Sequence, residues 1–189
     1  MKLIKFKNND STEELPIVIT FGSFDGCHLG HKYLIDYLFK FYKDCLKYVF
    51  TFQVPPKVIL DEKRQELLSS LAEKVHFLKE MDLDGVILCN FDDEISKIAP
   101  ETFLNRLYEM LPNIKMIILG HDFKFGHERS GDYRTIVDYV LPRKTAVTIV
   151  EPFYLDDKRI SSSLIRDNLR EGNIEEAEKS PKKIKIEKK

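Results

Sequence analysis

The sequence predicts an α/β protein built on a doubly wound, Rossmann-like parallel sheet of about five strands. Two observations predict this fold class: short runs rich in Val, Ile and Phe recur along the chain, and segments with helical spacing lie between them. Strands that are apolar throughout are typical of a parallel sheet covered by helices on both faces. In such a sheet, ligands bind outside the carboxyl ends of the strands.

The apolar runs give the expected strands: Ile17–Phe21, Tyr48–Phe52, Gly85–Leu88, Lys115–Leu119 and Ala146–Val150. The first expected helix follows the first strand, with one apolar face made of Leu29, Tyr33, Leu34, Tyr37, Leu38 and Phe41. A second helix is expected from Leu71, and a third around Phe103 and Leu107 with Pro100 in its first turn.

Length and composition indicate one globular domain. The chain has 189 residues, which is typical of one domain. Because residues 180–189 are rich in Lys, we expect the domain over 1–179 and a Lys-rich tail over 180–189. A net charge of -1 argues against a dedicated nucleic-acid or membrane-surface binder. No apolar run is long enough for a membrane span and no signal peptide is evident, so we expect a cytoplasmic protein. The 3 cysteines form no Cys-x-x-Cys pair, which indicates neither a disulfide framework nor a zinc site.

A glycine-rich segment, Gly22 to His31, follows the first expected strand. Its glycines allow the backbone to approach a ligand closely. His28 and His31 are three residues apart at the start of a helix, so they share a face beside free backbone N–H groups, where an anion would bind. A single histidine there would more often be packed or solvated, but two at this spacing favour a phosphate site.

A serine segment, Ile160 to Arg166, lies near the other end of the chain. The simplest interpretation is a helix start, with Ser162 or Ser163 as the N-cap and Gly172 ending the helix. The hydroxyl groups and Arg166 would also offer hydrogen bonds to phosphate oxygens. Both interpretations can hold together.

An aromatic loop, Gly120 to Asp132, follows the fourth expected strand. It is either a polar loop with two buried rings or a ligand loop in which Phe123 or Phe125 offers a ring face to a planar group. The familiar P-loop and Gly-x-Gly-x-x-Gly nucleotide loops do not occur in the sequence.

The three segments together resemble a known family. Gly22-Ser23-Phe24-Asp25-Gly26-Cys27-His28-Leu29-Gly30-His31 is similar to the signature of the nucleotidylyltransferases. With Thr51-Phe52, the aromatic loop and the serine segment added, the chain resembles the FMN adenylyltransferase (FAD synthetase) module of prokaryotic bifunctional riboflavin kinase/FAD synthetases over about residues 15 to 178. The resemblance implies a nucleotidylyltransferase fold without a kinase barrel, and transfer of AMP from ATP to FMN, giving FAD and pyrophosphate. Riboflavin kinase activity is not expected.

The resemblance also implies roles for individual residues. His28, His31, Ser162 and Arg166 would be catalytic, and Mg²⁺ would be held mainly by the phosphates of ATP rather than by dedicated protein ligands. The residues expected to bind ATP are Gly22, Ser23, Phe24, Asp25, His28, His31, Asp122, Ser162, Ser163 and Arg166. Those expected near the flavin are Phe52, Phe123 and Phe125, although Pro55 stands where the family usually has a histidine.

Two alternatives remain open from the sequence. The chain could be another nucleotidylyltransferase that acts on a sugar or alcohol phosphate, or a nucleotide-binding remnant without turnover. The oligomeric state is not predicted.

Overall fold

The computed structural model describes residues 1–6, 14–60 and 66–173; the predicted Lys-rich tail lies outside the described residues. Six strands form one parallel sheet in the order β1-β4-β3-β2-β5-β6. These strands are β1 (Lys2–Lys5), β2 (Ile17–Phe21), β3 (Leu46–Phe52), β4 (Gly85–Cys89), β5 (Ile114–Gly120) and β6 (Ala146–Val150). The parallel α/β prediction is confirmed.

Strand β1 is the one that the sequence did not predict, and it brings the sheet to six strands where about five were expected. It pairs in parallel with β4 at the edge of the sheet, where Lys2 lies opposite Gly85. Three of its four residues are exposed, and only Ile4 is half-buried. An edge strand with little burial carries no apolar run, and therefore its pairing cannot be seen in the hydrophobic pattern.

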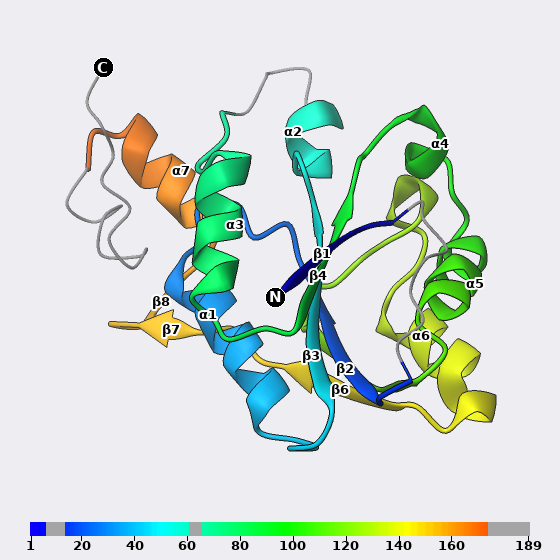
Figure 1. The fold of residues 1–189 in the computed structure, drawn as a ribbon. Helices are drawn as coiled ribbons and strands as arrows, with labels where there is room; N and C mark the ends of the chain where they lie inside the picture. Colours follow the sequence, from blue (N-terminus) through cyan, green and yellow to red (C-terminus); the bar gives the residue numbers. More distant parts are fainter. Residues whose placement is uncertain (7–13, 61–65, 174–189) are drawn as a thin grey trace.

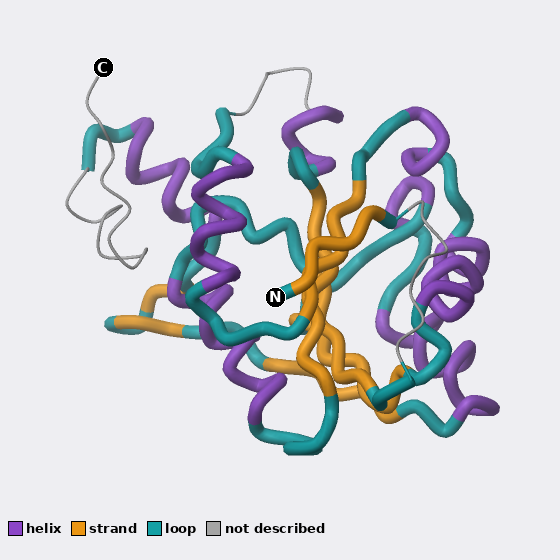
Figure 2. The backbone as a smooth tube through the Cα atoms, viewed as in Figure 1, coloured by secondary structure: helices purple, strands orange, loops and turns teal. Residues whose placement is uncertain are grey.

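Helices cover both faces of the sheet (Figures 1 and 2). One layer contains α1 (Leu29–Asp36), α3 (Leu71–Lys79) and α7 (Ser162–Arg170). The other layer contains α4 (Asp93–Ser96), α5 (Pro100–Met110) and α6 (Tyr133–Val140). The remaining elements are α2 (Pro56–Leu60), which follows β3, the antiparallel pair β7 (Tyr154–Leu155) and β8 (Lys158–Arg159), and the 3₁₀ turns Tyr37–Phe39, His127–Arg129 and Leu141–Arg143.

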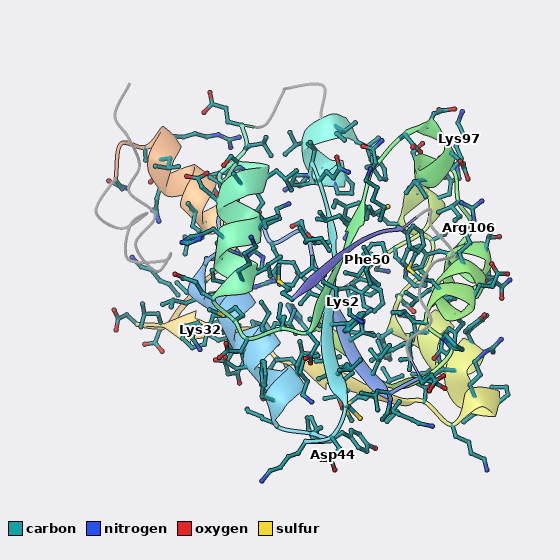
Figure 3. All side chains as sticks on the ribbon, in the orientation of Figure 1. Lys2, Lys32, Asp44, Phe50, Lys97 and Arg106 are labelled. Carbon is teal, nitrogen blue, oxygen red and sulfur yellow. The ribbon has the colours of Figure 1, made fainter. Side chains whose placement is uncertain are left out.

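Alternate residues of each buried strand enter two separate cores. In β2, Ile17, Ile19 and Phe21 belong to the core under α5 and α6, while Val18 belongs to the core under α1 and α3. Phe50 of β3 lies in the middle of the molecule, whereas the labelled charged side chains of Asp44, Lys97 and Arg106 lie at its periphery (Figure 3). The strands read as uniformly apolar because both of their faces are covered.

The helix ends follow local signals. Pro100 stands at the first turn of α5, as predicted. Gly172, with φ 78°, lies just beyond the end of α7, which the sequence also predicted. The predicted N-cap of α7 was wrong by one residue: Ser161, not Ser162 or Ser163, has the extended backbone, and its Oγ accepts from the N–H of Leu164 at 3.2 Å. The hydroxyl of Ser162 is thereby free for other partners.

The strand order places a topological switch point between β2 and β5. The chain continues from β2 to β3 on one side, while β5 pairs with the opposite side of β2. The loops that leave the carboxyl ends of β2 and β5 therefore diverge, which is where open α/β sheets bind ligands. These loops are the glycine-rich segment and the aromatic loop. Within the described ranges, no helix has the length and apolar character needed to cross a membrane.

Candidate active site

The glycine-rich segment turns sharply from β2 into α1. Phe24, Gly26 and Cys27 all have positive φ values, of 49°, 79° and 44°. This turn sets His28 at the N-cap of α1. A Cβ at Gly30 would lie 2.9 Å from the carbonyl oxygen of Ile160, so only glycine permits the close approach of α1 to the serine segment.

His28 joins the glycine-rich segment to the serine segment. Its Nδ1 accepts from the N–H of His31 at 3.2 Å, and its Nε2 lies 3.3 Å from Oγ of Ser162. Ser162 Oγ in turn donates to the carbonyl oxygen of Asp25 at 2.9 Å. One neutral tautomer satisfies all three contacts, with the proton on Nε2 donated to Ser162. The ring of His31 stacks on that of His28, with centroids 3.6 Å apart.

Both imidazoles are neutral at neutral pH. Burial, with a smaller contribution from the charge of Arg159, lowers the pKa of His28 from 6.5 to about 4. Burial also holds the pKa of His31 well below 6.5, helped by His28 and Lys74. Nδ1 of His31 is a buried atom without a hydrogen-bond partner among the described residues. The His31 ring therefore has unused hydrogen-bonding capacity at the carboxyl edge of the sheet.

Asp25 and Arg166 form a buried ion pair beneath the glycine-rich segment. Nη2 of Arg166 donates to Oδ2 of Asp25, and only 9% and 2% of the two side chains are exposed. Oδ1 of Asp25 accepts from the N–H groups of Leu68 and Ser69, both at 3.1 Å. Nε of Arg166 donates to the carbonyl oxygen of Glu66. The pair thus links α7 and the glycine-rich segment to the residues that directly precede α3.

The other residues expected to bind ATP take simpler positions. The N–H of Gly22 donates to the carbonyl of Phe50 at 3.1 Å, and the carbonyl of Ser23 accepts from Thr51 Oγ1 at 3.2 Å. Phe24 is fully buried, and its ring packs 5.0 Å from that of His31. Ser163 is exposed in the first turn of α7.

Two basic residues that the sequence analysis did not single out lie at this site. Arg159 forms an ion pair of 2.6 Å with Asp122 at the start of the aromatic loop. Burial raises the pKa of Asp122, but the hydrogen bond and charge of Arg159 outweigh it and leave that pKa below its ordinary value. Lys74 of α3 is 1% exposed, and its Nζ donates to the carbonyl of Phe52 at 2.7 Å. Arg159 directly precedes the serine segment and could have been noticed, whereas nothing in the helical pattern marks Lys74 as buried.

The expected flavin residues lie in the opposite layer. Phe123 and Phe125 stack with centroids 5.5 Å apart, and Phe123 packs against Phe21 at the end of β2. Phe52 ends β3 and packs against Phe50 of the same core. All three expected rings are half-buried. Pro55, at the position where the resemblance implied a histidine, is buried, and its carbonyl accepts from the N–H of Val58 as α2 begins.

Comparison with known proteins agrees with this arrangement. The family described as FAD synthetase matches residues 10–164 of the chain. The chain belongs to the FAD synthetase family. This match spans the glycine-rich segment, the aromatic loop and most of the serine segment, so the family assignment and the cluster at the switch point rest on the same residues.

Curated relatives of this FAD synthetase family member carry one shared description. A bifunctional riboflavin kinase/FMN adenylyltransferase from Buchnera aphidicola (subsp. Schizaphis graminum) is 30% identical over 184 residues, which are 95% of this chain and 59% of that protein. Relatives of the same description from Bacillus subtilis and Escherichia coli are 30% and 29% identical and cover 86% and 94% of this chain. The chain spans between 52% and 59% of the length of these three relatives.

Solved structures support the fold. A structure described as a macrolide-efflux protein from Streptococcus pneumoniae is 27% identical, with a TM-score of 0.79 over 95% of this chain and 59% of that one. A pantoate-beta-alanine ligase from Francisella tularensis has a TM-score of 0.59 at 18% identity, over 95% of this chain and 77% of that one. The second likeness concerns the fold alone.

Proposed function

We propose that this chain is an FMN adenylyltransferase, which transfers AMP from ATP to the phosphate of FMN and releases pyrophosphate. The observation that carries the proposal is the contact of Ser162 with both His28 and the backbone of Asp25, which joins segments 134 and 137 residues apart in a member of the FAD synthetase family. The joined segments lie at the switch point, beside the aromatic loop.

The reaction needs little proton transfer from the protein. The phosphate of FMN is already an anionic nucleophile, and pyrophosphate is a good leaving group once its charge is matched. The protein would supply alignment and charge stabilisation in a partly water-excluded site. The ring of His31, whose Nδ1 has no hydrogen-bond partner among the described residues, is the neutral group available for phosphate oxygens, while Ser162 holds His28 in place through its contact with Nε2.

The cationic groups would complete this role. Arg159 carries a positive charge at the edge of the site, where it lowers the pKa of His28. Phosphate oxygens close to the two rings would raise the pKa values of His28 and His31 towards their ordinary range, because an adjacent anion favours the charged imidazole. Binding of the nucleotide would therefore strengthen the hydrogen bonds that the rings donate.

Magnesium would come with the nucleotide. In the described part of the chain, no group of three or more His, Cys, Asp or Glu side chains is arranged to hold a metal ion. The carboxylate of Asp25 is already bound to Arg166 and to backbone N–H groups, and Asp122 is bound to Arg159. Mg²⁺ would thus be held mainly by phosphate oxygens, where it neutralises the charge of the triphosphate.

The test is a direct assay. The purified chain is incubated with ATP, Mg²⁺ and FMN, and FAD is measured by mass together with released pyrophosphate. We expect equal amounts of both products. Riboflavin in place of FMN should give no FAD, since the attacking phosphate is then missing, and CTP should give little product. A folded chain that binds ATP but forms no FAD would overturn the proposal.

A further inference from the structure

Lys74 is the most deeply buried cation of the described residues. It lies on α3, one of the outer helices, and is only 1% exposed. Burial of an ammonium group is costly unless an anion or several acceptors compensate it. Among the described residues, the carbonyl oxygen of Phe52, at the carboxyl end of β3, is the acceptor that lies within hydrogen-bond distance of Nζ.

The nearby carboxylate is already occupied. Burial lowers the pKa of Lys74, and the charge of Asp25 only partly offsets this. The two oxygens of Asp25 bind Arg166 and the N–H groups of Leu68 and Ser69. Of the buried described residues around the glycine-rich segment, Asp25 carries one negative charge, and Lys74 and Arg166 each carry one positive charge. His28 and His31 are neutral there. Among the described buried residues around this segment, one positive charge is therefore unmatched, and Lys74 is close enough to His31 for its charge to act on that ring.

We propose that Lys74 is a positioning residue whose unmatched positive charge is neutralised by the phosphates of the nucleotide bound at His28 and His31. The ammonium group acts through the glycine-rich segment rather than by contact, because it is enclosed and already donates to the end of β3. This inference rests on the proposed function for the location of the phosphates, and it adds the residue that supplies the charge.

A second buried lysine provides the matched control. Lys47 lies near the opposite end of β3, is 5% exposed, and its Nζ donates to the carbonyl oxygens of Tyr42 and Cys45. It thus resembles Lys74 in burial and in its use of backbone acceptors. The two lysines differ in their distance from the switch point, so comparing them separates the effect of charge at the site from that of losing a buried lysine.

The experiment measures binding of ATP and of adenosine to the full chain by calorimetry, together with thermal unfolding. We expect Lys74→Met to weaken ATP binding roughly tenfold and to leave adenosine binding unchanged, since adenosine carries no phosphate. Without ligand, this variant should unfold at the same or a higher temperature, because an unmatched buried charge has been removed. Lys47→Met should bind both ligands as the wild type does.

Lys74→Gln keeps the test decisive if the methionine variant does not fold, because it retains an N–H donor for Phe52 but lacks the charge. Unchanged ATP binding in Lys74→Gln would overturn the proposal, and so would equal weakening of ATP and adenosine. FAD formation by the wild type is measured separately. A wild type that makes no FAD while its ATP affinity depends on Lys74 would contradict the proposed reaction but not the role of Lys74.

Discussion

The two sides of the sheet differ sharply at its carboxyl edge. On the side of α1, α3 and α7, the buried groups include Asp25, His28, Lys74 and Arg166, linked by hydrogen bonds and charge. On the side of α5 and α6, the same strand ends meet phenylalanine rings, whose centroids lie between 5.0 and 6.2 Å apart where Phe6, Phe21, Phe50 and Phe103 pack together.

The difference shows how one sheet can form two binding surfaces, one polar and one aromatic. Alternate residues of a strand point to opposite faces, so a polar layer and an aromatic layer can meet along one edge without mixing. A polar layer suits phosphates. The half-buried rings of Phe52, Phe123 and Phe125, which lie against the buried phenylalanines, suit a planar aromatic group. The proposed substrates, ATP and FMN, would need both kinds of surface. Substitutions on either side should therefore have separable effects.

The largest effect is expected in the polar layer, for His31→Ala. If the ring donates to a phosphate oxygen as the transition state forms, its loss should lower kcat roughly 10²- to 10³-fold. The measurement is the steady-state rate of FAD formation, with circular dichroism to show that the variant is folded. His76→Ala is the matched control, since 77% of the His76 side chain is exposed on α3. Near-normal turnover of His31→Ala would mean that the stacked rings serve structure only.

A second expectation concerns pH and the same two rings. Below pH 6.5 an unfolded chain protonates its histidines, whereas folded His28, with its pKa of about 4, does not. The unfolded state then binds more protons, so the free energy of unfolding falls as the pH drops from 6.5 to about 4. The loss attributable to His28 is roughly 2–3 kcal/mol by this linkage.

Urea unfolding at several pH values between 7 and 4 measures this loss. Replacing His28 by Gln should flatten the decline, and replacing the exposed His76 by Gln should not change it. His31 contributes in the same direction, because its pKa is also lowered by burial. A decline that is equally steep without His28 would show that other groups cause it.

The sequence predicted the framework better than the polar interior. The predicted strands and the starts of α1, α3 and α5 lie where apolar spacing, Pro100 and the glycine-rich segment indicated. Strand β1 was missed, since it buries only part of Ile4 and is held by pairing with β4. The burial of Lys74 was missed for a related reason: a lysine at a helical position gives no local signal that it faces inward.

The ion pair of Asp25 with Arg166 shows a further limit of sequence reasoning. Both residues were singled out, but their pairing across 141 positions depends on how α7 docks beside the glycine-rich segment. Motif spacing identifies the residue types that a site needs, while tertiary packing decides which of them bind each other. The placement of Ser161 rather than Ser162 at the N-cap of α7 is a smaller example, because three successive serines are locally equivalent candidates.

The smallest effect is expected in the aromatic layer, for Phe125→Ala. Loss of a ring face should raise the KM for FMN roughly tenfold while the KM for ATP stays nearly constant. The ring of Phe125 also packs against Phe103, with centroids 5.6 Å apart, so a folding defect is a competing cause. Phe125→Leu, which keeps most of the apolar volume, should show the same selectivity for FMN with less loss of thermal stability. Phe39→Ala serves as the control, because Phe39 is 43% exposed and outside both layers of the site. Equal increases of both KM values would place Phe125 in the core only, and the two layers would then not be the separate subsites that their chemistry suggests.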